Sequence, residues 1–288
     1  MQKSLGLGAI GINGKTLAES IEIAKAAGFD AIGFDIREAA ARADEKGIDH
    51  VKALFTDASI VPGHWGVPAN RNDDAQFTKD VADLPRLAKI ATALGCPRCT
   101  SGIMPGSNTL PYDENYTRTL AQFKQLAQPL ADAGVMIGIE FISPKTLRDT
   151  LKYPFIYKMG ETLEFGEKVG TGNIGVLLDI WHLWQSGDEV SALDTITVRD
   201  VVVVHVNDAP VGIPCDEQQD LVRALPMETG VLDLVGFMRK LEAMGYDGPV
   251  MPEPFSAAVN AIAKDDPLAA AKLVAASMDK LWAASGLS

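Results

Sequence analysis

Residues 200–208 read DVVVVHVND, and this stretch decides the fold class. Four consecutive valines leave no polar side chain to face water, so a strand formed here is buried on both faces. Parallel strands covered by helices have this character, whereas a strand with one face in solvent alternates apolar and polar residues. The run ends at His205, one of four histidines in the chain, and Asn207 and Asp208 follow it.

The same alternation of short apolar runs with longer helical patterns continues along the whole chain. In TLAESIEIAKAAG, Leu17, Ile21 and Ala24 share one helix face and Gly28 ends the helix. The runs that predict strands are 4–11, 30–36, 59–64, 96–101, 135–141, 174–179, 200–206 and 248–253. Eight strands alternating with helices predict one (β/α)8 TIM barrel over residues 1–288. A doubly wound open sheet is the alternative, but it usually has fewer units and often a glycine-rich first turn.

Composition restricts the class of protein. The 288 residues carry a net charge of −12, which disfavours nucleic-acid binding because that requires a basic surface. No window approaches about 18 uninterrupted apolar residues, so we expect no membrane span, and the N-terminal segment lacks a signal-peptide cleavage pattern.

Three cysteines cannot all pair within one chain, which predicts a cytoplasmic protein. Residues 96–99 spell CPRC at a predicted strand, where a structural role is favoured over a redox pair.

Polar residues end the last four predicted strands. The runs GVMIGIE, NIGVLLD, VVVVH and GPVMPE end in Glu140, Asp179, His205 and Glu253. The carboxyl ends of barrel strands meet at one rim, although Asp179 taken alone also suits a helix cap and His205 a packed histidine. Three carboxylates at one rim repel one another unless a cation lies between them. With an imidazole they suit Mn²⁺, Mg²⁺ or Co²⁺, so we predict one divalent cation, with Mn²⁺ in first place.

Two further stretches complete a pattern that is known from one family. LLDIWH at 177–182 has the form Asp-x-x-His, and RALPMETGVLD at 223–233 is similar to an Arg-x-x-Pro-Gly-x-Gly loop, with Met227 in place of a glycine. With the four strand ends, the chain resembles the xylose-isomerase-like barrel superfamily of sugar isomerases and epimerases over essentially its whole length. Ketose 3-epimerases and inosose or hydroxypyruvate isomerases are the closest in motif.

The resemblance implies roles for individual residues. It assigns one divalent cation to a set of four ligands, namely Glu140, Asp179, His205 and Glu253. Glu140 and Glu253 would also form the acid/base pair, while His182 and Arg223 would contact the substrate. Many relatives form dimers or tetramers, so a homodimer or homotetramer is expected.

The predicted constellation supports chemistry at a carbon next to a carbonyl. A bound cation would act as a Lewis acid on a small sugar or keto-sugar and stabilise the enediolate that proton removal produces. Glu140 and Glu253 come from different strands and would flank the substrate, one removing a proton and the other returning it. His64 ends a predicted strand, where it would hydrogen-bond a sugar hydroxyl unless it is only packed in its loop. Trp65 would present an apolar ring face beside it.

Three other functions are alternatives to an isomerase or epimerase. A lyase or dehydratase, or a deglycosidase of 3-oxo-glycosides with a small second subunit, would use the same enolate and expel a leaving group. The zinc AP endonucleases of this superfamily bind three zinc ions through further histidines, and the four histidines here leave none for such sites. A non-catalytic barrel would be expected to lack one of the four ligands.

Several other charged residues receive structural explanations. Asp35 and Glu38 suit helix capping or salt bridges with Arg37 or Arg42. Lys145 and Arg148 stand in a loop with no recognisable code, and they would either receive an anionic substrate group or remain solvated. The first pair lies within GFDIRE at 33–38 and the second within SPKTLR at 143–148.

Overall fold

The computed structural model describes residues 1–287 and contains a closed barrel of eight parallel strands. The first and last strands pair through Gln2 and Pro249, which closes the sheet and confirms the predicted TIM barrel. In chain order the barrel strands are β1 (Gln2–Leu5), β2 (Ala31–Phe34), β3 (Val61–Gly66), β4 (Arg98–Ile103), β6 (Met136–Phe141), β8 (Ile174–Asp179), β9 (Val201–Val206) and β10 (Pro249–Pro252).

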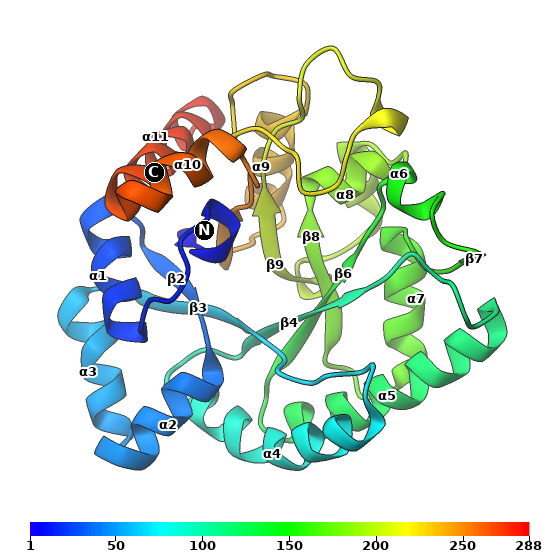
Figure 1. The fold of residues 1–288 in the computed structure, drawn as a ribbon, viewed down its shortest axis with the longest axis horizontal. Coiled ribbons are helices and arrows are strands. Elements are labelled where there is room, and N and C mark those ends of the chain that lie inside the picture. The colour runs from blue at the N-terminus through cyan, green and yellow to red at the C-terminus, as the bar shows by residue number, and fades with distance from the viewer. Residues whose placement is uncertain (288) are drawn as a thin grey trace.

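Helices surround the barrel on the outside (Figure 1). They are α1 (Leu17–Ala27), α2 (Ile36–Lys46), α3 (Ile48–Ala58), α4 (Asp74–Ala93), α5 (Tyr112–Asp132), α6 (Lys145–Arg148), α7 (Met159–Val169), α8 (Ile180–Gln185), α9 (Leu234–Ala243), α10 (Ala257–Asp265) and α11 (Pro267–Ser285). A two-stranded antiparallel sheet, β5 (Gly106–Ser107) with β7 (Tyr153–Pro154), joins two loops outside the barrel. None of these helices combines the length and the apolar character needed to cross a bilayer.

Local sequence explains where the elements begin and end. Every residue of β9 is buried, as the uninterrupted valine run predicts. Helix α1 begins at a capping box formed by Thr16 and Glu19, and ends at Gly28 in the left-handed region with φ 86°. The predicted first strand at 4–11 is too long, because β1 ends at Leu5 and residues 8–10 form a 3-10 helix that turns at Gly11.

The CPRC cysteines lie in the packed layer between the barrel wall and the helices. Cys96 and Cys99 are both buried among apolar side chains that include Phe123 of α5. Burial raises the pKa of the Cys96 thiol to about 12 and also raises the pKa of Cys99. A redox pair needs an accessible thiolate, so their placement supports the structural role.

Candidate metal centre

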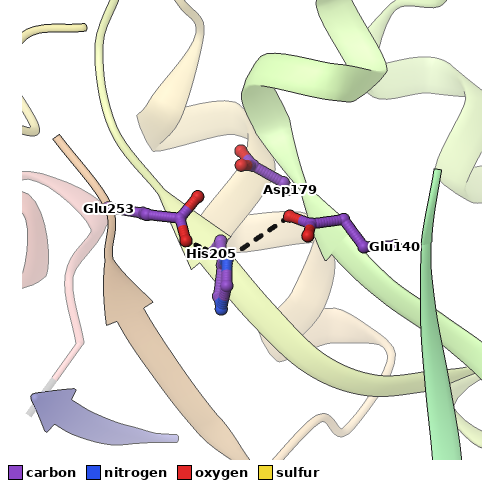
Figure 2. A group of neighbouring side chains, drawn as sticks. All are labelled: Glu140, Asp179, His205 and Glu253. Carbon is purple, nitrogen blue, oxygen red and sulfur yellow. Dashed lines mark ion pairs between the residues drawn. The ribbon is translucent and has the colours of Figure 1, made fainter. Parts of the chain in front are cut away.

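Four strand ends bring three carboxylates and one imidazole together. One ligand atom from each residue lies within 4.8 Å of the others, in the set Glu140, Asp179, His205 and Glu253. The register of the sheet places them side by side, because Asp179 pairs with His205 across β8 and β9, and Met251 pairs with His205 across β9 and β10. Figure 2 shows the three carboxyl groups gathered around His205.

His205 lies between two of the carboxylates (Figure 2). Its Nδ1 is 3.6 Å from Oε1 of Glu140 and 3.5 Å from Oε1 of Glu253. Burial opposes a charge on the ring, but the carboxylates of Glu253 and Glu140 outweigh burial and raise the pKa of His205 to about 10. Without a cation, a proton on His205 therefore neutralises part of the carboxylate charge.

The donor atoms fit a divalent cation. Within the described residues, Oε1 of Glu140 and both ring nitrogens of His205 are buried without a hydrogen-bond partner. Buried polar atoms without partners are costly, and ligation of an ion would satisfy them. A set of three carboxylates and one imidazole is rich in hard oxygen ligands, and such sets bind divalent metals.

Asp179 is fixed by three donors. It is 0% exposed, and its Oδ1 accepts from the backbone N–H of Trp181 at 2.8 Å and from Nδ2 of Asn207 at 3.1 Å. Its Oδ2 accepts from Nη1 of Arg223 at 2.7 Å. Burial raises the pKa of this carboxyl, but the charge of Arg223 and the neighbouring histidines outweigh burial and lower it. Asp179 thus caps α8 and also stands ionised among the candidate ligands.

Arg223 is buried beside the candidate ligands. Its side chain is 1% exposed, and Nη1 forms ion pairs with Asp179 at 2.7 Å and with Glu253 at 2.9 Å. The guanidinium lies 5.2 Å from the ring centroid of Trp181 and 5.1 Å from that of Phe255. The resemblance predicts a substrate contact for Arg223, and the structure adds that this side chain orients two carboxylates of the centre.

The loop that carries Arg223 is held by Asp208, a residue for which the sequence predicts no role. The buried carboxylate accepts five backbone N–H bonds at 2.7–3.1 Å, from Ala209, Thr229, Gly230, Val231 and Leu232. Met227 has φ 64°, the left-handed conformation that glycine favours, so the loop keeps this turn although methionine replaces glycine. In the sequence, the signal for this anchor was the polar pair Asn207 and Asp208 directly after the valine strand.

His182 lies at the same site, one helical turn beyond Asp179. Its Nδ1 accepts from the backbone N–H of Ser143 at 3.3 Å. A backbone N–H only donates, so Nδ1 is the acceptor in this bond. The other ring nitrogen, Nε2, is 3.8 Å from Oε1 of Glu140 and 3.3 Å from Nη2 of Arg223. The structure therefore brings His182 to the candidate ligands, where the resemblance predicts a substrate contact.

His64 and Trp65 point to different sides of β3. The ring centroids of His64 and His205 are 6.2 Å apart, so His64 borders the centre. Burial, and secondly the charge of His205, lower the pKa of His64 to about 3. The Trp65 ring is 0% exposed and donates from Nε1 to the carbonyl of Cys96 at 3.3 Å. This corrects the prediction for Trp65, because successive strand residues face opposite sides and the ring lies in the outer core.

A cavity of about 510 Å³ adjoins the centre on the side of β1, β2 and β3. Glu253 and His64 line its inner end, and Lys15 lines another part. Asp35 also lines it but caps α2, while Glu38 pairs with Arg42 at 2.8 Å, so both have the predicted structural uses. The cavity lies within the size range of small-molecule sites.

Lys145 and Arg148 are engaged by their own loop. Lys145 pairs with Asp149 at 2.5 Å, and Arg148 donates to the carbonyl of Ser143 at 2.9 Å while packing on Tyr157. Of the two uses that were left open, these contacts favour local structure over binding of an anionic substrate group.

A family model for xylose isomerase-like TIM barrels matches residues 21–281. The chain belongs to the xylose isomerase-like TIM barrel family. Among its relatives, the inosose isomerase of Halalkalibacterium halodurans is 25% identical over 214 residues, which cover 72% of this chain and 68% of that relative.

Solved structures of the xylose isomerase-like fold superpose over nearly the whole chain. A xylose isomerase domain protein of Alicyclobacillus acidocaldarius matches with a TM-score of 0.86 and 25% identity, covering 99% of both chains. The IOLI protein with a bound zinc atom matches with a TM-score of 0.74 and 16% identity, covering 99% of this chain and 98% of that protein. At 16% identity the second likeness concerns the fold alone.

Proposed function

We propose that this protein is a divalent-metal-dependent isomerase or epimerase of a sugar or a keto-cyclitol. One observation carries the proposal: four strand ends bring one ligand atom each from Glu140, Asp179, His205 and Glu253 within 4.8 Å. The relative named inosose isomerase, 25% identical over 72% of this chain, supports the reaction class.

The same four residues would hold the cation. We propose Mn²⁺ in first place, with Mg²⁺ or Co²⁺ as alternatives, because oxygen ligands predominate. Because a structural neighbour contains a bound zinc atom, the affinity for zinc should be measured beside that for Mn²⁺. When bound, such a cation polarises a substrate carbonyl and acidifies the adjacent C–H bond.

Glu140 and Glu253 would transfer the proton. They extend from β6 and from the end of β10, with His205 of β9 near both carboxylates, so they reach a substrate from two directions. One group, as a carboxylate, removes the proton next to the carbonyl, and the other, as a carboxylic acid, returns a proton to the opposite face or to the neighbouring carbon. Arg223 holds the second oxygen of Glu253 at 2.9 Å, which fixes that carboxylate for its task.

The remaining groups would select and orient the substrate. His182 would donate from Nε2 to a substrate oxygen, His64 would hydrogen-bond a hydroxyl, and Arg223 would contact the substrate as the resemblance predicts. Among the described residues, the charged groups that line the cavity are the carboxylates of Asp35, Glu38 and Glu253 and the ammonium of Lys15. This balance favours an uncharged polyhydroxylated substrate over a phosphorylated one.

Metal content per chain, measured by mass spectrometry after purification with Mn²⁺, tests the proposal first. We expect about one Mn²⁺ or similar ion per chain, lost in His205→Ala. The loaded enzyme should then exchange a carbon-bound proton of ketoses or inososes in D₂O. Protein with no metal would contradict the proposal, and three zinc ions would indicate an AP endonuclease instead.

Product analysis separates isomerisation from elimination. Release of water or of an aglycone in place of reversible exchange would assign the protein to the lyases or deglycosidases. A homodimer or homotetramer, and the small second subunit of a deglycosidase, remain predictions. We propose the cytoplasm as its location, since Cys96, Cys99 and Cys215 are all free.

A further inference from the structure

A second polar cavity, of about 350 Å³, lies between the loops that follow β3 and β4 and the start of α5. Its lining includes two arginines, Arg71 and Arg118, and no aspartate or glutamate among the described residues. Amide and hydroxyl groups complete it, among them those of Asn70, Thr109 and Asn115. In a chain with a net charge of −12, a cavity with this positive balance is selective for anions.

Arg71 is held in place without a counter-charge. Its Nη2 donates to the carbonyl of Gly102, and its guanidinium lies 4.9 Å from the ring centroid of Phe123. Its own carbonyl accepts from Gln122 at 2.8 Å and from Arg118 at 3.3 Å, which anchors the loop on α5. Burial lowers the pKa of Arg71, and within residues 1–287 no ion pair compensates for burial. A half-buried cation in this position gains from an anionic ligand.

Arg118 supplies a second charge at the same cavity. It pairs with Asp74 at 3.1 Å, but Asp74 is 87% exposed, so this pair contributes little and leaves most of the guanidinium charge uncompensated. Two guanidiniums with neighbouring amide and hydroxyl donors match the several oxygens of a phosphate group.

We propose that this cavity, with Arg71 as its principal cation, binds a phosphate group or a closely similar oxyanion. The site is separate from the proposed metal centre. It is lined by the loops after β3 and β4, whereas none of the four candidate metal ligands lines it. Arg71 nevertheless contacts β4 at Gly102, which pairs with Glu140 of β6, so an anion here lies next to the strand of one candidate ligand.

Calorimetric titration with inorganic phosphate at constant ionic strength tests the site. We expect saturable binding by the metal-loaded protein, and an affinity at least about tenfold lower in Arg71→Gln. Arg86→Gln, which removes a charge from an exposed arginine of α4, is the matched control and should bind as the parent does. Asn115→Asp should also weaken binding, because it adds a carboxylate to the cavity without altering side-chain size.

The metal centre itself is the alternative binding place, and the variants separate the two. Phosphate held at the cavity is lost in Arg71→Gln and retained in His205→Ala, whereas phosphate held by the metal shows the reverse. No binding up to about 10 mM, or equal affinities for the parent and Arg71→Gln, would overturn the proposal. Tighter binding of acetate than of phosphate would overturn the assignment to a phosphate group.

Discussion

The strands β6, β8, β9 and β10 carry or lead into the four candidate ligands at the rim, whereas β1, β3 and β4 end in Leu5, Gly66 and Ile103, and the Asp35 that follows β2 caps α2. This half supplies the candidate ligands and, among them, the groups proposed for proton transfer. The other half supplies space, since the cavity of about 510 Å³ lies over β1–β3. Among the described residues of those strands, His64 is the one that presents a polar side chain to the cavity. The barrel thus separates the groups proposed for chemistry from the surfaces proposed for substrate selection.

Removal of an acid/base carboxylate should have the largest effect. Glu140→Gln and Glu253→Gln should each lower kcat by about a thousandfold while the melting temperature remains close to that of the parent, because the amide cannot exchange a proton. Steady-state kinetics on a confirmed substrate provide the measurement. Glu242→Gln, on the exposed side of α9, should leave kcat unchanged. Near-normal turnover in both site variants would remove the pair from the mechanism.

Arg223→Met should combine a stability loss with weaker substrate binding. It leaves Asp179 and Glu253 without their buried partner, so the metal-free protein should lose about 3 kcal/mol of unfolding free energy. Urea denaturation with and without the cation gives the unfolding free energies of the metal-loaded and the metal-free protein. The KM for the substrate should also rise. Arg86→Met, in an exposed pair, should change stability by less than about 1 kcal/mol. An unchanged KM would limit Arg223 to support of the carboxylates.

Metal affinity should depend on pH through His205. The metal-free protein holds a proton on this ring below its pKa of about 10, and a coordinating nitrogen must be free of a proton. Cation binding therefore displaces one proton, and the association constant should rise about tenfold per pH unit near neutrality. Mn²⁺ titrations at pH 7 and pH 8 measure this slope.

The opposite half of the rim provides the control for that slope. The pKa of His64 is lowered to about 3, so its ring is already neutral between pH 7 and pH 8. The His64→Asn variant should therefore retain the same dependence of Mn²⁺ affinity on pH. An affinity independent of pH would mean that the proton on His205 does not compete with the cation.

The smallest effect is expected where a glycine makes room for His64. A Cβ at Gly33 would lie 2.8 Å from Cε1 of His64, so Gly33→Ala must displace that ring. KM should rise several-fold with kcat nearly constant, if this half of the rim only selects the substrate. Gly160→Ala, where a Cβ meets no atom within 4 Å, is the matched control. A fall in kcat as large as that in Glu140→Gln would contradict the separation of the two halves.

Strand ends were predictable because hydrophobic runs and barrel geometry are both regular. A fully apolar run must be buried on both faces, and parallel strands bring their carboxyl ends to one rim. Asp179 and His205 follow from this reasoning, and their pairing across β8 and β9 confirms that they are neighbours. Strand alternation also indicates that the Trp65 ring faces away from His64, as the structure shows.

The sequence by itself determined the barrel, the order of its strands and the identity of the four residues at the rim, because each depends on local pattern and on a closed parallel sheet. Only the tertiary structure decided the partners of Arg223 and the oxyanion cavity around Arg71. Both arginines come from irregular loops, whose paths depend on long-range bonds such as those that Asp208 accepts from residues 229–232. No repeating pattern encodes those bonds, so the folded chain alone brings these charges to their places.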